Sequence, residues 1–151
     1  MGKITTPKET ETEHLQMLDS PLEEHLELFH EVRGYRASAF TTYKGDVIAF
    51  DSLDERINTS KMGQFFCEMF NYTDQEISKK GFIGCAEMQM LLGDNLFLIF
   101  SSGDFSLITT RLVILLEKDG NYSLAKMNAG KVVKSLMNTI TWSTDNYLLP
   151  T

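Results

Sequence analysis

The sequence predicts an α+β fold, a five-stranded antiparallel sheet with helices on both faces. Its apolar residues follow a helical period in three segments and form strand-like, β-branched or aromatic runs in five others, in the order α-β-β-α-β-β-β-α. A two-strand hairpin and a three-strand meander are therefore joined by a helix that must cross the sheet. Such an arrangement is typical of one layered domain.

The first helix is expected between Ser20 and Gly34. Ser20 and Glu23 form a Ser-x-x-Glu capping box, and glycine is a common residue after the end of a helix. Leu22, Leu26, Phe29 and Val32 recur at helical spacing, whereas Glu23, Glu24, Glu27 and Glu31 occupy the opposite side. This helix should therefore present an acidic, solvated surface.

Short apolar runs separated by glycine-containing turns predict the strands. The run at 111–117 has the highest apolar content and should be buried on both faces, and the first strand should be central. The segment 105–110 either extends this last strand or forms a bulged link. The five expected strands are residues 37–43, 47–51, 84–92, 95–102 and 111–117.

The middle helix is expected from about Asp54 to Lys80, with Asp51, Asp54 and Glu55 available to cap it. About 25 residues at 1.5 Å each would span nearly 40 Å, more than one small sheet needs to have covered. Part of its aromatic stripe must face the core. Its excess length also favours a helix–helix contact between two subunits.

The last helix is expected from Tyr122 to about Thr141, which gives a single domain at residues 15–141. Residues 1–14 are polar and predict a disordered tail. Residues 142–151 are expected to form a C-terminal tail. Its Trp142 and Tyr147 favour either a partner contact or packing back on the domain.

The charge balance is acidic, with 14 basic and 21 acidic residues and a net charge of -7. This argues against binding to a nucleic-acid backbone. The acidic surface either maintains solubility or suits a basic protein partner. The N-terminal sequence lacks the apolar core of a signal peptide, and no apolar run reaches the roughly 18 residues of a membrane span. Together with Cys67 and Cys85, expected to be reduced and buried, these features predict a cytoplasmic protein without membrane insertion.

No catalytic, metal or cofactor site is expected. His25 and His30 are five positions apart and cannot share a helix face as an i, i+4 metal pair does. Neither cysteine has an adjacent Lys or His that would lower its pKa. Phosphate-binding loops and the Gly-x-Ser-x-Gly motif are absent, and the Gly-x-x-Gly at 81–84 lacks the basic surroundings of a nucleic-acid clamp.

Two stretches resemble the roadblock family, whose members include dynein light chains, Ragulator subunits and bacterial MglB. The first comprises residues 32–39 (VRGYRASA) and 44–49 (KGDVIA), which match a Gly before the first strand, small residues within it and a Gly-containing turn. The second comprises residues 112–116 (LVILL) and 121–125 (NYSLA), a buried strand followed by the start of the last helix. Ser123 replaces a glycine that the family commonly has there. The resemblance covers roughly residues 20–140.

The resemblance implies a longin-like sheet and a homodimer, or a paired heterodimer, whose sheets join through the third strand beneath two crossing middle helices. In several members this helical platform binds a Ras-like GTPase. The edge position and low charge of residues 84–92 independently favour pairing with a second copy.

Two sets of site residues follow. Partner binding is expected at Lys61, Gln64, Glu68 and Asn71, which flank the aromatic stripe of the middle helix. The dimer interface is expected to contain Phe65, Phe66, Met69, Met88, Met90 and Leu92.

The function that fits these predictions is a non-catalytic, homodimeric interaction module, and thus not an enzyme, that binds and regulates a small Ras-like GTPase. One alternative is a scaffold or motor-adaptor subunit without nucleotide sensitivity. Another is a sensory domain that binds a small apolar ligand, which would need a preformed cavity.

Overall fold

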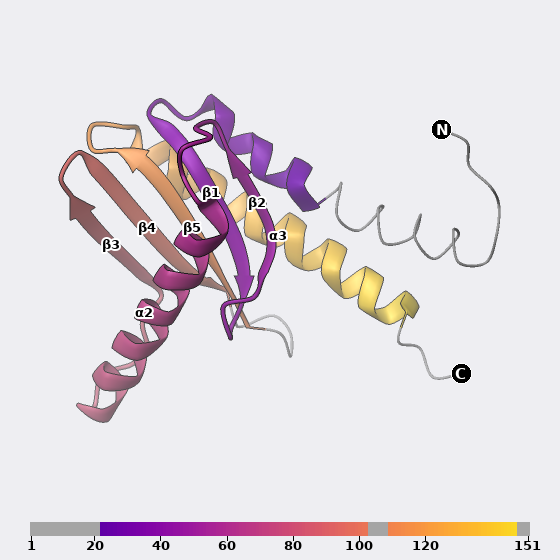
Figure 1. The fold of residues 1–151 in the computed structure, drawn as a ribbon. Coiled ribbons are helices and arrows are strands. Elements are labelled where there is room, and N and C mark those ends of the chain that lie inside the picture. The colour runs from indigo at the N-terminus through magenta and orange to yellow at the C-terminus, as the bar shows by residue number, and fades with distance from the viewer. Residues whose placement is uncertain (1–21, 103–108, 148–151) are drawn as a thin grey trace.

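The computed structural model describes residues 22–102 and 109–147, with side chains up to residue 140 in the last helix (Figure 1). The described elements are η1 (Glu27–Glu31), β1 (Tyr35–Thr42), β2 (Val47–Ser52), α2 (Thr59–Lys79), β3 (Glu87–Leu92), β4 (Asn95–Ser102), β5 (Thr110–Glu117) and α3 (Tyr122–Tyr147). This order confirms the predicted fold class.

The five strands form one antiparallel sheet in the order β2-β1-β5-β4-β3. β1 and β5 lie in its interior, as predicted, and every residue of β5 except Glu117 is buried. β3 forms one margin of the sheet (Figure 1). It begins at Glu87 rather than at Gly84, so its predicted first residues belong to the connection from α2.

The first helix is less regular than predicted. Residues 22–26 are α-helical, and η1 then continues as a 3-10 helix. Ser20 lies outside the described residues. Gly34 follows this segment with a φ of 88°, and a Cβ atom there would lie 2.7 Å from the Cα atom of Gly120. Only glycine therefore allows the end of the first helix to meet the turn after β5.

α2 begins at Thr59, later than predicted, because Asn58 provides the cap by accepting a hydrogen bond from the Lys61 amide. Asp54 does not cap the helix. Its carboxylate instead binds the guanidinium groups of Arg36 and Arg56, each at 2.9 Å. The 21 residues of α2 span about 31 Å. Its C-terminal end still projects past the strands (Figure 1).

Helices cover both faces of the sheet. α2 packs on one face, where Phe66 and Phe70 contact the inward side chains of β1, β4 and β5. α3 and the N-terminal helical segment pack on the other face, with Leu26, Phe29 and Leu136 in the core. The alternation of side chains along β5 supplies both cores, because successive residues of a strand point to opposite faces.

α3 continues to Tyr147, beyond the end predicted at Thr141. The first part of the predicted C-terminal tail is therefore helical. Residues 148–151, the 1–14 tail and most of the 105–110 link lie outside the described residues, although Thr110 belongs to β5.

Candidate interaction surface

The margin strand β3 has a hydrogen-bonded neighbour on one side only. β4 pairs with it from Glu87 to Leu92, and no strand in the described part of the chain follows on the other side. Leu91 is 59% exposed and Leu92 48% exposed. An apolar edge with unpaired backbone groups is a surface to which a further strand can add.

The single acidic residue of β3 is held against α3. Glu87 accepts a hydrogen bond from the Tyr122 hydroxyl and forms a 3.0 Å ion pair with Lys126. Partial burial acts to raise the pKa of Glu87, but the hydrogen bonds from Tyr122 and Lys126 outweigh it and lower that pKa. The charge is therefore directed toward the α3 face, so the α2 side of β3 remains apolar.

An apolar surface continues from β3 onto α2. The Phe65 ring, 58% exposed, makes an edge-to-face contact with Phe66 at 5.0 Å between ring centroids. Phe66 stacks on Phe97 of β4 at 4.2 Å, and Phe97 is the register partner of Met90. Half-buried Met88 and Met90 thus extend a row that begins at an exposed phenylalanine.

We call this row the apolar flank: Phe65, Met69 and Tyr72 of α2 with Met88, Met90 and Leu92 of β3. Tyr72 is 66% exposed, and its position seven residues after Phe65 places both on one side of the helix. Phe66 does not belong to the flank, since it is 5% exposed and forms part of the core of its own chain. It supports Phe65 from beneath.

α2 approaches β1 closely at one point, and this fixes the helix on the sheet. Gly63 lies so near β1 that a Cβ atom there would be 2.6 Å from the Cβ of Ala39. α2 therefore covers mainly β1, β2 and β5. The α2 side of β3 and β4 is consequently left half-open.

The predicted partner-binding residues lie next to the apolar flank on the surface of α2, since Lys61 is four residues before Phe65 and Glu68 is four residues before Tyr72. Gln64 lies beside the β1–β2 turn at Gly45. Lys61, Gln64 and Glu68 are exposed and form what we call the polar flank. Asn71 has a different role. Its amide donates to the Tyr43 carbonyl at 2.6 Å, and its Oδ1 accepts from Arg111 at 3.0 Å, so it joins α2 to the sheet.

Arg111 is the charged group at the centre of this junction. It is 2% exposed and donates to the Ser101 hydroxyl, while its guanidinium lies 4.7 Å from the Phe70 ring centroid and 5.2 Å from that of Tyr43. Burial lowers the pKa of Arg111. Nothing in the local sequence indicates this role, because a charged residue at the start of an apolar strand is usually solvated.

The two histidines in the described part of the chain each contact a polar side chain that is distant in sequence. His25 contacts the Thr139 hydroxyl at 3.2 Å, and His30 contacts the Asp51 carboxylate at 2.8 Å. Cys67 is buried and free, whereas Cys85 is free but only half-buried, contrary to the prediction. Within residues 22–102 and 109–147, no three His, Cys, Asp or Glu side chains come together as metal ligands would.

No helix in the described part of the chain combines the length and the apolar character needed to cross a bilayer.

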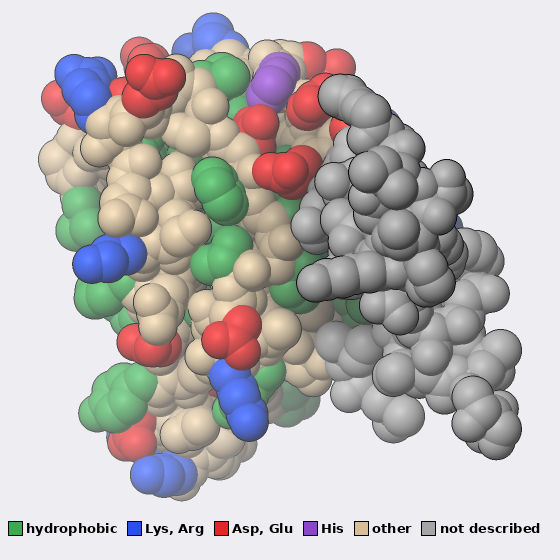
Figure 2. Space-filling view, turned by 45° about the vertical axis from the view of Figure 1, so that its right-hand side comes forward, with side chains coloured by type: hydrophobic (Ala, Val, Ile, Leu, Met, Phe, Trp, Pro, Cys, Tyr) green, Lys and Arg blue, Asp and Glu red, His purple; other side chains and the backbone are tan. Residues whose placement is uncertain are grey.

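On the outer surface, acidic side chains gather at the upper end of Figure 2. The first helix contributes exposed Glu27 and Glu31, which agrees with its predicted acidic surface.

Solved structures share this arrangement. MglB, a gliding protein of Thermus thermophilus, superposes with a TM-score of 0.68 at 14% identity, over 81% of this chain and 90% of that one. A Roadblock/LC7 domain from Streptomyces avermitilis gives a TM-score of 0.62 at 15% identity, over 83% and 96%. The chain has the roadblock fold. MglB in a tetrameric arrangement also superposes on it, with a TM-score of 0.67 at 14% identity, over 82% and 93%.

Sequence comparison alone does not reveal this relationship, since no family model and no curated protein sequence matches the chain. The structural likeness confirms the fold expected from residues 32–39 and 112–116. Within this roadblock fold, Tyr72 is an exposed residue of the flank and Phe97 supports it from β4, and neither was predicted. The seven-residue spacing of Phe65 and Tyr72 could have indicated Tyr72.

Proposed function

We propose that two copies of this chain join through β3 and the apolar flank into a non-catalytic, cytoplasmic homodimer that binds and regulates a small Ras-like GTPase. The observation that carries the proposal is the continuity of the unpaired β3 edge with the half-open apolar flank. A second copy related by a twofold axis would complete both at once and would close the assembly.

The edge contributes backbone pairing and the flank contributes apolar burial. Pairing β3 with its copy would join two five-stranded sheets, and Phe65, Met69 and Tyr72 would face the same axis. The tetrameric arrangement of an MglB with the same fold supports self-association of this kind. Flexible methionines and aromatic rings are well suited to such a contact, because they adapt their shape while burying large areas.

The GTPase would then bind the polar flank. Dimerisation would leave Lys61, Gln64 and Glu68 exposed along the outer margin of the apolar flank. Roadblock proteins that bind Ras-like GTPases use the platform formed by their middle helices, which supports the same surface here. Any change in hydrolysis would arise from ordering of the GTPase's own switch loops.

Sedimentation tests the dimer. The full chain should sediment at twice 17.2 kDa at micromolar concentration. Phe65→Lys should sediment as a monomer, because a lysine cannot be buried at the apolar flank without a partner. Leu53→Lys is the matched control, since Leu53 is 57% exposed and lies before α2, away from the flank. A wild-type monomer would refute the proposed assembly.

Titration tests the partner. The small Ras-like GTPases of the same organism should be titrated into the full chain, loaded with GDP or with a non-hydrolysable GTP analogue. Regulation requires that the chain bind either the GDP-loaded or the GTP-loaded form of the GTPase more tightly than the other. Lys61→Glu should weaken that binding about tenfold, whereas Lys131→Glu, an exposed change on the opposite face, should not. Equal binding of both forms would support a scaffold instead, and no binding would exclude the GTPase.

A further inference from the structure

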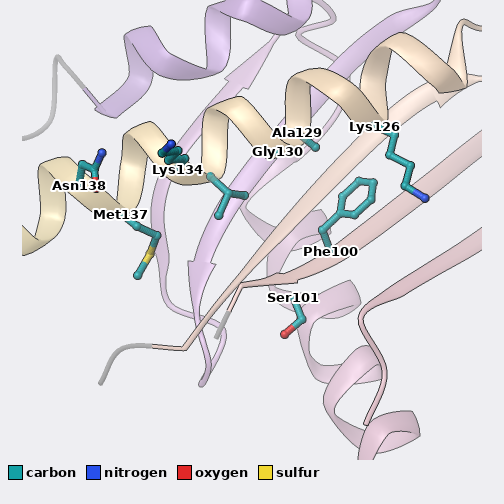
Figure 3. A pocket seen from close by; sticks show the side chains of 9 residues that line it. Phe100, Ser101, Lys126, Ala129, Gly130, Lys134, Met137 and Asn138 are labelled. Carbon is teal, nitrogen blue, oxygen red and sulfur yellow. The ribbon is translucent and has the colours of Figure 1, made fainter. Parts of the chain in front are cut away.

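A groove lies on the face of the sheet opposite α2, between α3 and the end of β4 (Figure 3). Its volume is about 550 Å³, and small-molecule pockets in proteins commonly have volumes of roughly 300–1,000 Å³. β4 contributes Phe100, whose ring points up toward the helix (Figure 3). Because the apolar flank is on the other face of the sheet, a ligand in this groove does not depend on the proposed function.

α3 contributes two neighbouring rows of residues to the groove. The inner row is apolar and consists of Ala129, Val133 and Met137, which are four residues apart and therefore share one side of the helix. Ala129 and Met137 are buried and Val133 is half-buried. Together with Phe100, this row gives the groove apolar walls.

The outer row is exposed and mostly polar, and it consists of Lys126, Gly130, Lys134 and Asn138. Gly130 leaves a gap in this row, because a Cβ atom there would have no neighbour within 4 Å. The gap lies between two lysines that are eight helical residues apart, or about 12 Å. The apolar groove thus opens to solvent beside positive charge.

The two lysines differ in their contacts. Lys126 forms a 3.0 Å ion pair with Glu87, whereas Lys134 forms no ion pair with any side chain in the described part of the chain. Residues 122–140 of α3 include no acidic residue, although the whole chain has a net charge of -7. Lys134 is therefore the cation of this groove that an anionic ligand would neutralise.

We propose that the groove binds a single-chain aliphatic carboxylate, such as a fatty acid. The carboxylate accepts hydrogen bonds from the Lys134 ammonium and the Asn138 amide, which are one helical turn apart. The alkyl chain lies along Val133 and Ala129 and ends near Phe100. Apolar walls with a few polar groups that fix the orientation of the ligand are typical of small-molecule sites.

The dimensions fit an alkyl chain of medium length. Lys126 and Asn138 are twelve helical residues apart, so the groove extends about 18 Å along α3. An extended alkyl chain advances roughly 1.3 Å per carbon atom, since its carbon–carbon bonds are about 1.5 Å long, and roughly 10–14 carbon atoms therefore fill the groove. A short carboxylate such as acetate would leave the apolar walls in water.

Isothermal titration of the full chain with sodium dodecanoate tests the proposal. Saturable binding at one site per chain is expected. The affinity should rise about two- to fourfold for each CH₂ group added between octanoate and dodecanoate, because each group leaves water. Acetate should not bind. Absence of saturable dodecanoate binding would overturn the proposal, because another part of the chain or a second copy would then fill the groove.

A pair of α3 variants places the ligand in the groove. Val133→Phe extends a ring into the groove and should weaken dodecanoate binding at least about tenfold, because the alkyl chain and the ring compete for the same space. Met127→Phe is the matched control, since Met127 is 55% exposed on α3 and does not line the groove. Unchanged affinity in a folded Val133→Phe variant would contradict the assignment.

A charge variant tests the position of the carboxylate and does not disturb the core. Lys134→Gln should weaken dodecanoate binding about two- to fivefold, the effect of losing an exposed ion pair. It should leave the binding of dodecanol unchanged, because the alcohol carries no charge. Lys131→Gln, an exposed change outside the groove, should affect neither ligand. Equal losses for dodecanol and dodecanoate in Lys134→Gln would overturn the proposed contact.

Discussion

Replacing Phe65 with alanine separates the stability of the subunit from that of the dimer. The side chain is 58% exposed in the single chain. Burying a Phe removes about 200 Å² from water, so about 115 Å² of Phe65 remains to be buried by a second copy. At about 25 cal/mol per Å² this burial is worth about 3 kcal/mol in each subunit.

A twofold dimer loses this contribution twice, but measured interface energies fall below such area sums. We therefore expect Phe65→Ala to raise the dimer dissociation constant by at least about a hundredfold, or about 2.8 kcal/mol. Sedimentation equilibrium over a range of concentrations measures this constant. Leu53→Ala, with nearly the same exposure, should leave it unchanged. Equal effects of the two variants would refute the assignment of Phe65 to the interface.

Four further predictions concern the stability of the fold. Gly63→Ala should lower the free energy of unfolding, measured in urea, by about 1–3 kcal/mol, because its Cβ atom would lie 2.6 Å from that of Ala39. Gly130→Ala has open space around it and should raise the free energy of unfolding by about 0.5–1 kcal/mol. Arg111→Met should cost about 2 kcal/mol in the same assay, because its buried hydrogen-bond partners lose a charged donor. Two arginines hold the pKa of Asp54 well below its usual range, so its stabilising effect is complete above the unfolded pKa of about 3.9 and is lost below it. The stability difference between wild type and Asp54→Asn should therefore shrink as the pH falls below about 4, and a constant difference would contradict this.

Local patterns in the sequence were sufficient for the order of the elements and for the edge position of β3. The period of apolar residues defines helices and strands without knowledge of their neighbours. Element ends were less predictable. The carboxylate of Asp54 is drawn to Arg36, distant in sequence, and α2 consequently begins after Asn58. The extension of α3 to Tyr147 was also missed, although Pro150 lies three residues beyond that end.

Individual site residues depended on contacts between elements. Phe65 and Phe66 are adjacent and identical in type, yet one is exposed and the other stacks on Phe97. Asn71 looked like a surface residue, but Arg111 and the Tyr43 carbonyl engage it. No local pattern distinguishes these cases, because the partners come from separate strands.

The sequence by itself determined the fold class, the roadblock-like element order and the presence of a low-charge strand followed by apolar runs. Only the tertiary structure decided which side of α2 faces solvent and where the α3 groove opens. The physical reason is the close approach of Gly63 to Ala39, which sets α2 over β1 and leaves the β3–β4 side of the sheet half-open. Such a contact depends on two surfaces fitting together, and neither segment alone specifies it.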